Sequence, residues 1–179
     1  CEIAQSEAAN GKPFARFWIH NGLVTINGQK MAKSLGNFIP VEGFLRDYDP
    51  EVLKLFFLSV HYRNPIDYTQ LRIEEAVRAR ERFYILFKKL FDRDEGSEER
   101  AALPAPVRAQ LATHAAAFTG AMDNDFNTAL ALAALFDMVS FAHRTLDDGS
   151  LSAAQAKEFA AIIRSELVRC GAVFGLFSS

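Results

Sequence analysis

The sequence predicts a mainly α-helical protein that contains one short β element and an antiparallel helical bundle. Apolar residues recur every three or four positions through most of the chain after residue 50, which is the spacing of amphipathic helices. The β-branched run 23–26 is followed by Asn27-Gly28, a pair typical of tight hairpin turns. Half of the 179 residues are hydrophobic, and 16 are Phe, so a sizeable core can be buried.

Residues 1–48 form the first predicted region, and they contain little continuous helix. Residues 1–10 have the pattern of a helix that ends at Asn10-Gly11, and residues 14–19 are short and aromatic. The hairpin turn then leads into a loop that carries two lysines. Because that loop leaves a small β element, we expect it at a surface where it can move.

Residues 49–93 form the second predicted region, which is helical. Asp49-Pro50-Glu51 is a strong helix start, because Asp caps free N–H groups, Pro presets φ and Glu favours the positive end of the helix dipole. The helix over 52–60 is apolar nearly all round and is therefore expected to be buried. Thr69 is expected to cap a longer helix that runs to about residue 91.

Residues 94–179 form the third predicted region, after a charged linker over 92–106 that contains Gly and Pro. Three helices are expected there, at roughly 105–121, 128–147 and 152–173, and the tight connection between the last two makes them antiparallel. Asn127 or Thr128 is expected to cap the middle helix. The residues expected on buried faces are Ala131, Leu135, Met138, Ala142 and Leu146 in the middle helix and Ala156, Phe159, Ile163 and Leu167 in the last.

Charge is unevenly distributed along the chain. Residues 1–93 carry 14 Lys and Arg against 11 Asp and Glu, whereas residues 94–179 carry 6 against 11, so net charges of +3 and −5 combine to −2. An anionic ligand is therefore expected on the N-terminal half.

The cysteine content and the absence of long apolar runs predict a location in the reducing cytosol. Cys1 and Cys170 provide neither a disulfide framework nor a Cys-x-x-Cys metal pair, which suits a reducing cytosol, and Cys170 is expected in the core. No apolar run approaches the length of a membrane span, and no signal peptide opens the chain. We therefore predict a cytoplasmic protein with no membrane partner.

The string Lys30-Met31-Ala32-Lys33-Ser34, within residues 28–37, is the most informative part of the chain. Like charges so close repel by about 1 kcal/mol even in water, so a polyanion such as a nucleoside triphosphate between them would explain the pair. For two lysines alone, the alternative is a solvated basic turn. The whole ten-residue string, however, resembles the Lys-Met-Ser-Lys-Ser loop of class I aminoacyl-tRNA synthetases, with alanine in place of the middle serine.

Further segments resemble cysteinyl-tRNA synthetases in particular, and they occur in the same order over nearly the whole chain. The resemblance implies the end of a class I, Rossmann-type catalytic domain over 1–48, a stem-contact region over 49–93 and a truncated, tRNA-binding helical bundle of the anticodon-side domain over 94–179. The strings are Glu2-Ile3-Ala4-Gln5-Ser6-Glu7, Trp18-Ile19-His20-Asn21-Gly22, Asp49-Pro50-Glu51-Val52-Leu53, His61-Tyr62-Arg63, Ala121-Met122-Asp123-Asn124-Asp125-Phe126-Asn127-Thr128 and Val173-Phe174-Gly175-Leu176.

The resemblance implies that the full protein activates cysteine with ATP and Mg to an adenylate and then transfers the cysteinyl group to tRNA(Cys). It implies that Lys33 contacts ATP and stabilises charge on the departing pyrophosphate, with Lys30 assisting, so both are candidate catalytic and ATP-binding residues. Met31 is expected to be an apolar peg that holds the loop down. Ala32 is expected to tune the position of the loop without loss of chemistry.

Glu2 matches the glutamate that, with two cysteines and a histidine, holds a zinc ion in this family. Zinc binds a thiolate well and a serine hydroxyl poorly, which provides discrimination for cysteine. The partner ligands and the His-Ile-Gly-His nucleotide motif would lie upstream of this sequence. We therefore expect a fragment that runs from the lysine loop onward, is inactive alone, is monomeric, and carries Glu2 as a zinc ligand only in the full protein.

Two alternative functions stay open at this point. One is the related ligase that joins cysteine to a glucosaminyl-inositol in mycothiol synthesis, although the Asp-Phe-Asn-Thr string at 125–128 favours the tRNA enzyme. The other is a non-catalytic helical module that binds tRNA. For the helix over 69–91, a solvated basic face and contact with tRNA phosphates are both open. Its basic residues are Arg72, Arg78, Arg80, Arg82, Lys88 and Lys89.

Overall fold

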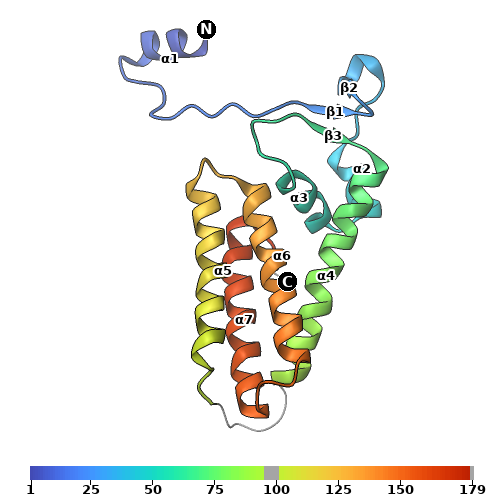
Figure 1. Ribbon diagram of the computed structural model, residues 1–179. Coiled ribbons are helices and arrows are strands. Elements are labelled where there is room, and N and C mark those ends of the chain that lie inside the picture. Colours follow the sequence, from blue (N-terminus) through green and yellow to red (C-terminus); the bar gives the residue numbers. More distant parts are fainter. Residues whose placement is uncertain (95–100, 178–179) are drawn as a thin grey trace.

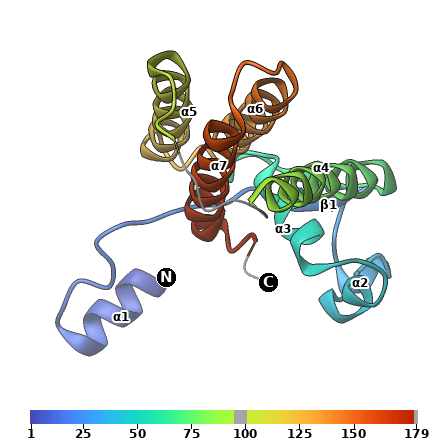
Figure 2. The same cartoon turned by 90° about the horizontal axis from the view of Figure 1, so that it is seen from below.

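The computed structural model describes residues 1–94 and 101–177, and it is dominated by four long helices (Figure 1). Helices α5, α6 and α7 run side by side, and α4 packs obliquely against α6 and α7 (Figures 1 and 2). The mainly α-helical class and the helical bundle are thus confirmed. The bounds are α4 Gln70–Asp94, α5 Ala105–Asp123, α6 Thr128–Asp147 and α7 Ala153–Phe174.

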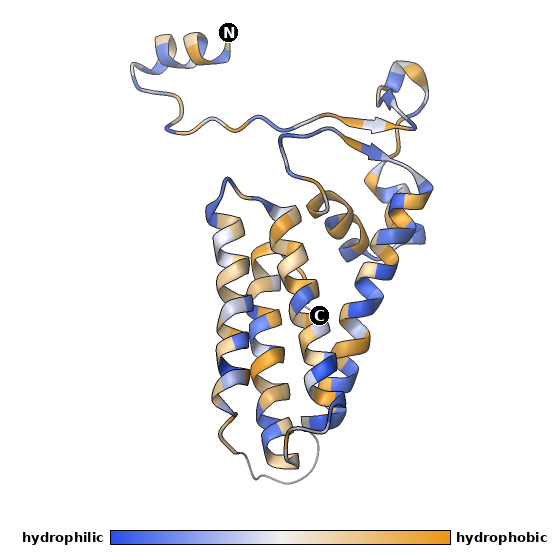
Figure 3. Ribbon diagram, in the orientation of Figure 1, coloured by the Kyte–Doolittle hydropathy of each residue, from blue (hydrophilic) through white to orange (hydrophobic). Residues whose placement is uncertain are grey.

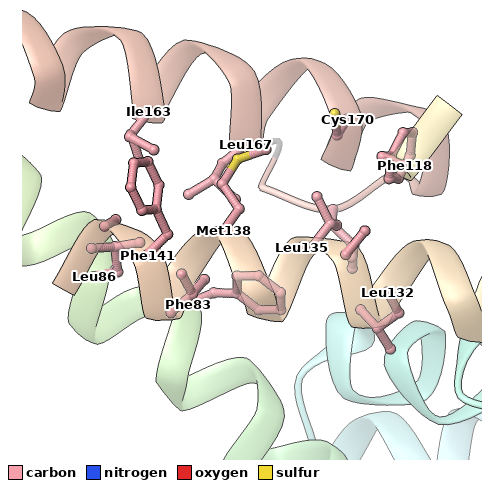
Figure 4. Close-up of a cluster of buried hydrophobic side chains, with 14 of the residues drawn as sticks. Phe83, Leu86, Phe118, Leu132, Leu135, Met138, Phe141, Ile163, Leu167 and Cys170 are labelled. Carbon is pink, nitrogen blue, oxygen red and sulfur yellow. The ribbon is translucent and has the colours of Figure 1, made fainter. Parts of the chain in front are cut away.

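The core of the molecule lies where α4, α5, α6 and α7 meet (Figure 4). Each large apolar side chain buried there contributes about 1.5–3 kcal/mol to folding. All nine residues expected on the buried faces of α6 and α7 are buried, as is Cys170, whose thiol pKa is raised by desolvation. The side chains that fill the core include Phe83, Leu86, Phe118, Leu132, Leu135, Met138, Phe141, Ile163 and Leu167.

The helix boundaries follow from capping residues that the sequence identifies. Asp49 accepts a hydrogen bond from the Glu51 N–H at 2.8 Å, and Asn127 caps α6 through the Leu130 N–H at 3.0 Å. Thr69 Oγ1 likewise accepts from the Arg72 N–H at the start of α4. Residues 95–100 of the predicted linker lie outside the described residues.

Helix α3 (Pro50–Leu58) departs from its prediction in two ways. It ends two residues before the expected position 60, because Ser59 Oγ donates to the Phe56 carbonyl and closes the last turn. It is also not buried all round, since Phe57 is 47% exposed. The short helix α2 (Val41–Asp47), which precedes α3, was not predicted.

A buried carboxylate joins α3 to α4 and to the end of the chain. Glu51 is 7% exposed and accepts hydrogen bonds from the Tyr84 hydroxyl at 2.9 Å and from the Phe177 N–H at 2.6 Å. The Arg80 guanidinium lies 3.3 Å from the same carboxylate and also pairs with Asp49 at 2.9 Å. This network compensates a charge that would be costly to bury alone.

The β element is a small sheet with the strand order β2-β1-β3. Strand β1 (Val24–Ile26) pairs antiparallel with β2 (Gln29–Lys30) through the expected tight turn, in which Asn27 and Gly28 have φ of 50° and 77°. Strand β3 (Ile66–Tyr68) pairs parallel with β1 and was not predicted. An extended segment joins this sheet to the terminal helix α1 (Glu2–Asn10), which lies apart from the bundle (Figures 1 and 2).

One helix corrects the expectation that no apolar run approaches the length of a membrane span. Among the described residues, α6 has 20 residues and enough mean hydropathy to qualify, and it is hydrophobic along most of its length (Figure 3). In contrast, α4 carries many hydrophilic residues. Ten residues of α6 are buried inside the bundle, which is the usual position of a core helix.

Gly22, just before β1, offers a test of how tightly the sheet is assembled. A Cβ at this position would lie 2.1 Å from the Asn64 carbonyl oxygen, so Gly22→Ala is expected to destabilise the chain by about 3 kcal/mol. Gly120→Ala, inside α5 and with open space around it, is the matched control and is expected to stabilise by about 1 kcal/mol. Thermal unfolding followed by far-ultraviolet circular dichroism measures both; equal effects of the two substitutions would contradict the close approach.

Candidate functional site

The two lysines lie on the hairpin and its continuation, at the edge of the small sheet. Lys30 ends β2, and Lys33 opens the short 3₁₀ helix η1 (Lys33–Leu35). Both side chains are exposed. Within residues 1–94 and 101–177, neither ammonium group forms an ion pair, so both charges face solvent and are available to an anion.

The Asn37 side chain bridges two backbone groups of the lysine loop. Its Oδ1 accepts a hydrogen bond from the Ala32 N–H at 2.9 Å, and its Nδ2 donates to the Lys30 carbonyl at 3.1 Å. Gly36, with φ of 66°, ends η1 and returns the chain toward Asn37. The side chain therefore fixes the backbone on which both lysines are mounted. Sequence reasoning missed Asn37, although an Asn directly after a left-handed Gly is a residue that often bonds nearby backbone.

Asp67 on β3 holds the other side of the hairpin. Its Oδ1 accepts from the Gly28 N–H at 2.8 Å and from the Thr25 hydroxyl at 2.7 Å. These two donors, the Gly28 N–H first, hold the pKa of the Asp67 carboxyl below its usual range. Asp67 thus ties the turn to β3 as an anion, and nothing in the local sequence indicates this contact.

The loop rests on an apolar seat. Met31 is half-buried and lines a cavity of about 240 Å³ between the loop and α3, which places it where an apolar peg is expected. The Lys33 Nζ lies 5.5 Å from the centre of the Phe38 ring, close enough for a cation–π interaction. The other lining residues are Val24, Phe38, Ile39, Val41, Phe44, Leu53, Phe56, Phe57 and Tyr68.

Ala32 occupies the N-cap position of η1. Its backbone is extended, with φ of −152° and ψ of 141°, and its side chain can make no capping bond. The Ala32 N–H is held by Asn37, so the loop keeps its path without a hydroxyl at this position. The effect of Ala32 on the position of the loop and on chemistry stays a prediction.

Glu2 lies far from the lysines, at the end of the molecule where α1 projects (Figure 1). It is exposed in the first turn of α1 and lines an open hollow together with Cys1, Trp18 and His20. Among the described residues there is no group of three His, Cys, Asp or Glu side chains arranged to hold a metal ion. The described residues alone do not fit a zinc site, and the zinc role of Glu2 stays a proposal for a longer protein.

Six of the basic residues of α4, between positions 72 and 89, divide into two sets. Three of them make contacts within the fold: Arg80 with Glu51 and Asp49, Arg82 over the Phe136 ring at 4.5 Å, and Lys89 with Asp147 at 2.5 Å. The other three are exposed and make no ion pair within the described part of the chain; they are Arg72, Arg78 and Lys88. Contact of the exposed basic residues with tRNA phosphates stays a prediction.

A second polar cluster, which sequence reasoning missed, joins the loop before β3 to the α5–α6 corner. The Asp125 carboxylate accepts from Arg63 Nε at 2.6 Å, from Arg63 Nη2 at 3.0 Å and from the Tyr62 hydroxyl at 2.7 Å. His61 Nε2 lies 3.8 Å away. The Arg63 and Tyr62 donors lower the pKa of the Asp125 carboxyl to about 2.

Comparisons with known proteins find similar sequences and a similar structure. The family model for the class I (C) tRNA synthetase catalytic domain matches residues 1–78, and the model for the DALR domain matches residues 117–178. The chain is 47% identical to the cysteine–tRNA ligase of Geobacter sulfurreducens, 46% to that of Geobacter metallireducens and 41% to that of Oleidesulfovibrio alaskensis. Each alignment covers 99% of this chain but only 36–37% of the relative.

A solved structure shares the fold at low identity. The agnB2 LeuRS of Agrobacterium radiobacter K84, crystallised in a ternary complex with tRNA and LeuAMS, superposes with a TM-score of 0.71 and 22% identity, over 87% of this chain and 20% of that chain. At this identity the likeness shows the fold alone. The two family matches show that residues 1–78 are similar to a class I tRNA synthetase catalytic domain and that residues 117–178 are similar to a DALR domain.

Within that class, the chain is similar to the cysteine–tRNA ligases, with which it aligns over nearly its whole length. It spans somewhat more than a third of the length of these curated relatives, 36% for the Geobacter sulfurreducens enzyme.

Removal of the Asn37 side chain tests how the lysine loop is held. In Asn37→Ala, the Ala32 N–H loses its acceptor, so its amide hydrogen is expected to exchange about five- to tenfold faster, as loss of one hydrogen bond implies. Asn21→Ala is the control, because within the described residues the Asn21 side chain donates to the carbonyl of the adjacent Gly22 and does not contact the lysine loop. Exchange of the Ala32 amide is measured by NMR, and an unchanged rate in Asn37→Ala would show that the loop is held elsewhere.

The depressed pKa of Asp125 predicts a pH dependence of stability. An unfolded Asp has a pKa of about 3.9, whereas folded Asp125 titrates at about 2, so its contribution is complete above pH 4 and is lost as the pH falls toward 2. The difference in melting temperature between the wild type and Asp125→Asn is therefore expected to shrink from pH 5 to pH 2. A difference that is constant over this range would contradict the assigned ion pair.

Proposed function

We propose that the longer protein to which this chain corresponds activates cysteine with ATP and then charges tRNA(Cys). The observation that carries the proposal is the 47% identity to a cysteine–tRNA ligase over 99% of this chain, with the lysine loop exposed and unpaired at the sheet edge. The match of residues 1–78 to a catalytic domain favours an enzyme over a non-catalytic module. The DALR match and the names of the relatives favour a tRNA ligase over a mycothiol-pathway ligase.

The lysines supply the electrostatic part of the activation step. A carboxylate oxygen of cysteine attacks the α-phosphorus of ATP, the bond to the bridging oxygen breaks, and pyrophosphate leaves with added negative charge. Positioned cations lower the barrier because the charge grows in the transition state. Lys33 takes this role in the proposal, and Lys30 assists from β2. Asn37 and Asp67 support it, because they hold the backbone of the loop while both ammonium groups stay exposed.

The remaining assignments concern the longer protein. We propose ATP with Mg as the nucleotide substrate, tRNA(Cys) and cysteine as partners, a cytoplasmic location and a monomeric state, with no membrane contact. The mostly buried α6 supports the last point, since its apolar surface is used inside the bundle. Zinc binding by Glu2 is proposed only where the longer protein supplies further ligands, and no step of the mechanism is derived through it.

The role of Lys33 is tested in the full-length enzyme. Lys33→Ala is expected to slow cysteine-dependent ATP–pyrophosphate exchange by roughly 100- to 1,000-fold, the usual cost of losing one donor to developing charge, with little change in the affinity for cysteine. Lys12→Ala removes an exposed lysine outside the loop and is expected to leave exchange unaltered. Equal losses in exchange and in cysteine binding would assign Lys33 a structural role.

The isolated 179 residues are expected to be inactive in the same assay. They carry the lysine loop, but the proposal assigns the nucleotide motif to the longer protein. Pyrophosphate exchange by the isolated chain, abolished by Lys33→Ala, would show that the whole activation site is present in it.

A further inference from the structure

We propose that Asp125, Arg63 and Tyr62 form a latch that positions the helical bundle relative to the strand pair bearing the lysine loop. The latch serves transfer of cysteine to tRNA and is dispensable for activation of cysteine. This inference rests on the proposed function. The three side chains contact one another at a junction between the catalytic-domain match and the DALR match, at residues 62–63 and 125.

The contact lies at the surface, with 61% of the Arg63 side chain and 43% of the Asp125 side chain exposed, but it has a defined two-point geometry. Arg63 binds both oxygens of Asp125, through Nε at 2.6 Å and Nη2 at 3.0 Å, and Tyr62 adds a third donor at 2.7 Å. A planar guanidinium that binds a carboxylate at two points fixes angle as well as distance. The Arg63 guanidinium also lies 5.3 Å from the Tyr62 ring centre. Asp125 is thus oriented by two consecutive residues of one loop.

The backbone that presents Asp125 is held in an unfavourable conformation. Asp125 and Phe126 have φ of 56° and 50°, so two consecutive residues other than glycine lie in the left-handed region. Such conformations persist only where the surroundings fix them. The cap that Asn127 makes on α6 secures one side of this corner, and Arg63 and Tyr62 secure the other. This backbone conformation therefore places the Asp125 carboxylate in contact with Tyr62 and Arg63.

A continuous run of backbone hydrogen bonds connects the latch to the lysines. The Tyr62 carbonyl accepts from the Gly22 N–H at 2.7 Å, and the Leu23 carbonyl accepts from the Ile66 N–H at 3.0 Å. Leu23 leads directly into β1, and β1 pairs with β2, which ends at Lys30. The latch therefore joins the bundle to the same sheet that carries the lysine loop, while the loop itself is held by Asn37 and Asp67.

The same junction has a second tie on the bundle side. Thr128 Oγ1, in the first turn of α6, donates to the Val60 carbonyl at 3.4 Å, in the loop that follows α3. Together with the latch it fixes the end of the bundle nearest the sheet. In contrast, the Glu51 network ties α3 to the middle of α4 and to Phe177. The α5–α6 corner is thus oriented by the latch together with the Thr128–Val60 contact.

The position of the latch indicates that it affects transfer of cysteine to tRNA and not activation of cysteine. It touches neither Lys30 nor Lys33, and in our proposal activation needs only the loop, ATP and cysteine. A tRNA seated on the bundle, however, must bring its terminal ribose to an adenylate held beside the loop. Misplacement of a bound substrate by about 1 Å costs on the order of 100-fold in rate. Loosening the latch should therefore slow transfer selectively.

The test uses the full-length enzyme and two assays. Asp125→Asn and Arg63→Gln are expected to keep tRNA-independent ATP–pyrophosphate exchange within about twofold of wild type, while single-turnover transfer to tRNA falls roughly 10- to 100-fold. Arg63→Lys keeps the charge but not the two-point contact, so its transfer rate should lie between those of the wild type and Arg63→Gln. Glu166→Gln is the matched control, because it breaks the Arg169–Glu166 pair inside α7 and should change neither rate.

Each outcome of the test has a meaning. Equal losses in exchange and transfer, or no loss in transfer, would overturn the latch while leaving the proposed function standing. A wild-type enzyme that neither exchanges nor charges tRNA would overturn the proposed function and the latch with it. If Asp125→Asn does not fold by circular dichroism, Tyr62→Phe removes a single donor at 2.7 Å and carries the same test with a smaller expected loss of transfer.

Discussion

The arrangement of the molecule depends on one buried carboxylate. Glu51 is 7% exposed and accepts from the Tyr84 hydroxyl and the Phe177 N–H, with Arg80 as its counter-charge. Burial of an ionised side chain costs free energy unless the charge is paired and hydrogen-bonded. Tyr84, Phe177 and Arg80 together offset this cost for Glu51. Because they come from α4 and from the end of the chain, the carboxylate fixes where α3 lies on the bundle.

The position of α3 in turn determines the floor of the lysine loop. Leu53, Phe56 and Phe57 of α3 line the apolar cavity beneath the loop, and Met31 lines it from above. The hairpin itself is held by Asp67 and Asn37, which bond to backbone groups and to Thr25. Asp67 and Asn37 therefore fix the shape of the loop, while the ammonium groups of both lysines stay free to contact a ligand.

Local patterns predicted much of this structure, because their causes are local. Asp49 and Asn127 cap helices, Gly28 turns the hairpin, and the apolar periodicity of α6 and α7 identifies their buried faces. The nine residues concerned are buried because a helix repeats the same face every three or four positions.

Features that depend on distant partners were not predictable in this way. Strand β3 has three residues with a carboxylate at its centre, and only its parallel pairing with β1 makes it a strand. The partners Arg63 and Asp125 are 62 positions apart, so no spacing rule connects them. The lysines were recognised from a resemblance, whereas Asn37 and Asp67, which hold their loop, became visible only in three dimensions.

The placement of the single tryptophan has a practical consequence. Trp18 lies on the extended segment between α1 and β1 and is 46% exposed. The sequence contains no other tryptophan, so the core holds no indole ring. Intrinsic tryptophan fluorescence therefore reports on this segment and is insensitive to the packing of α4, α5, α6 and α7. Conversely, the same residue is a natural optical probe for anything that comes to cover the hollow beside Glu2 and His20.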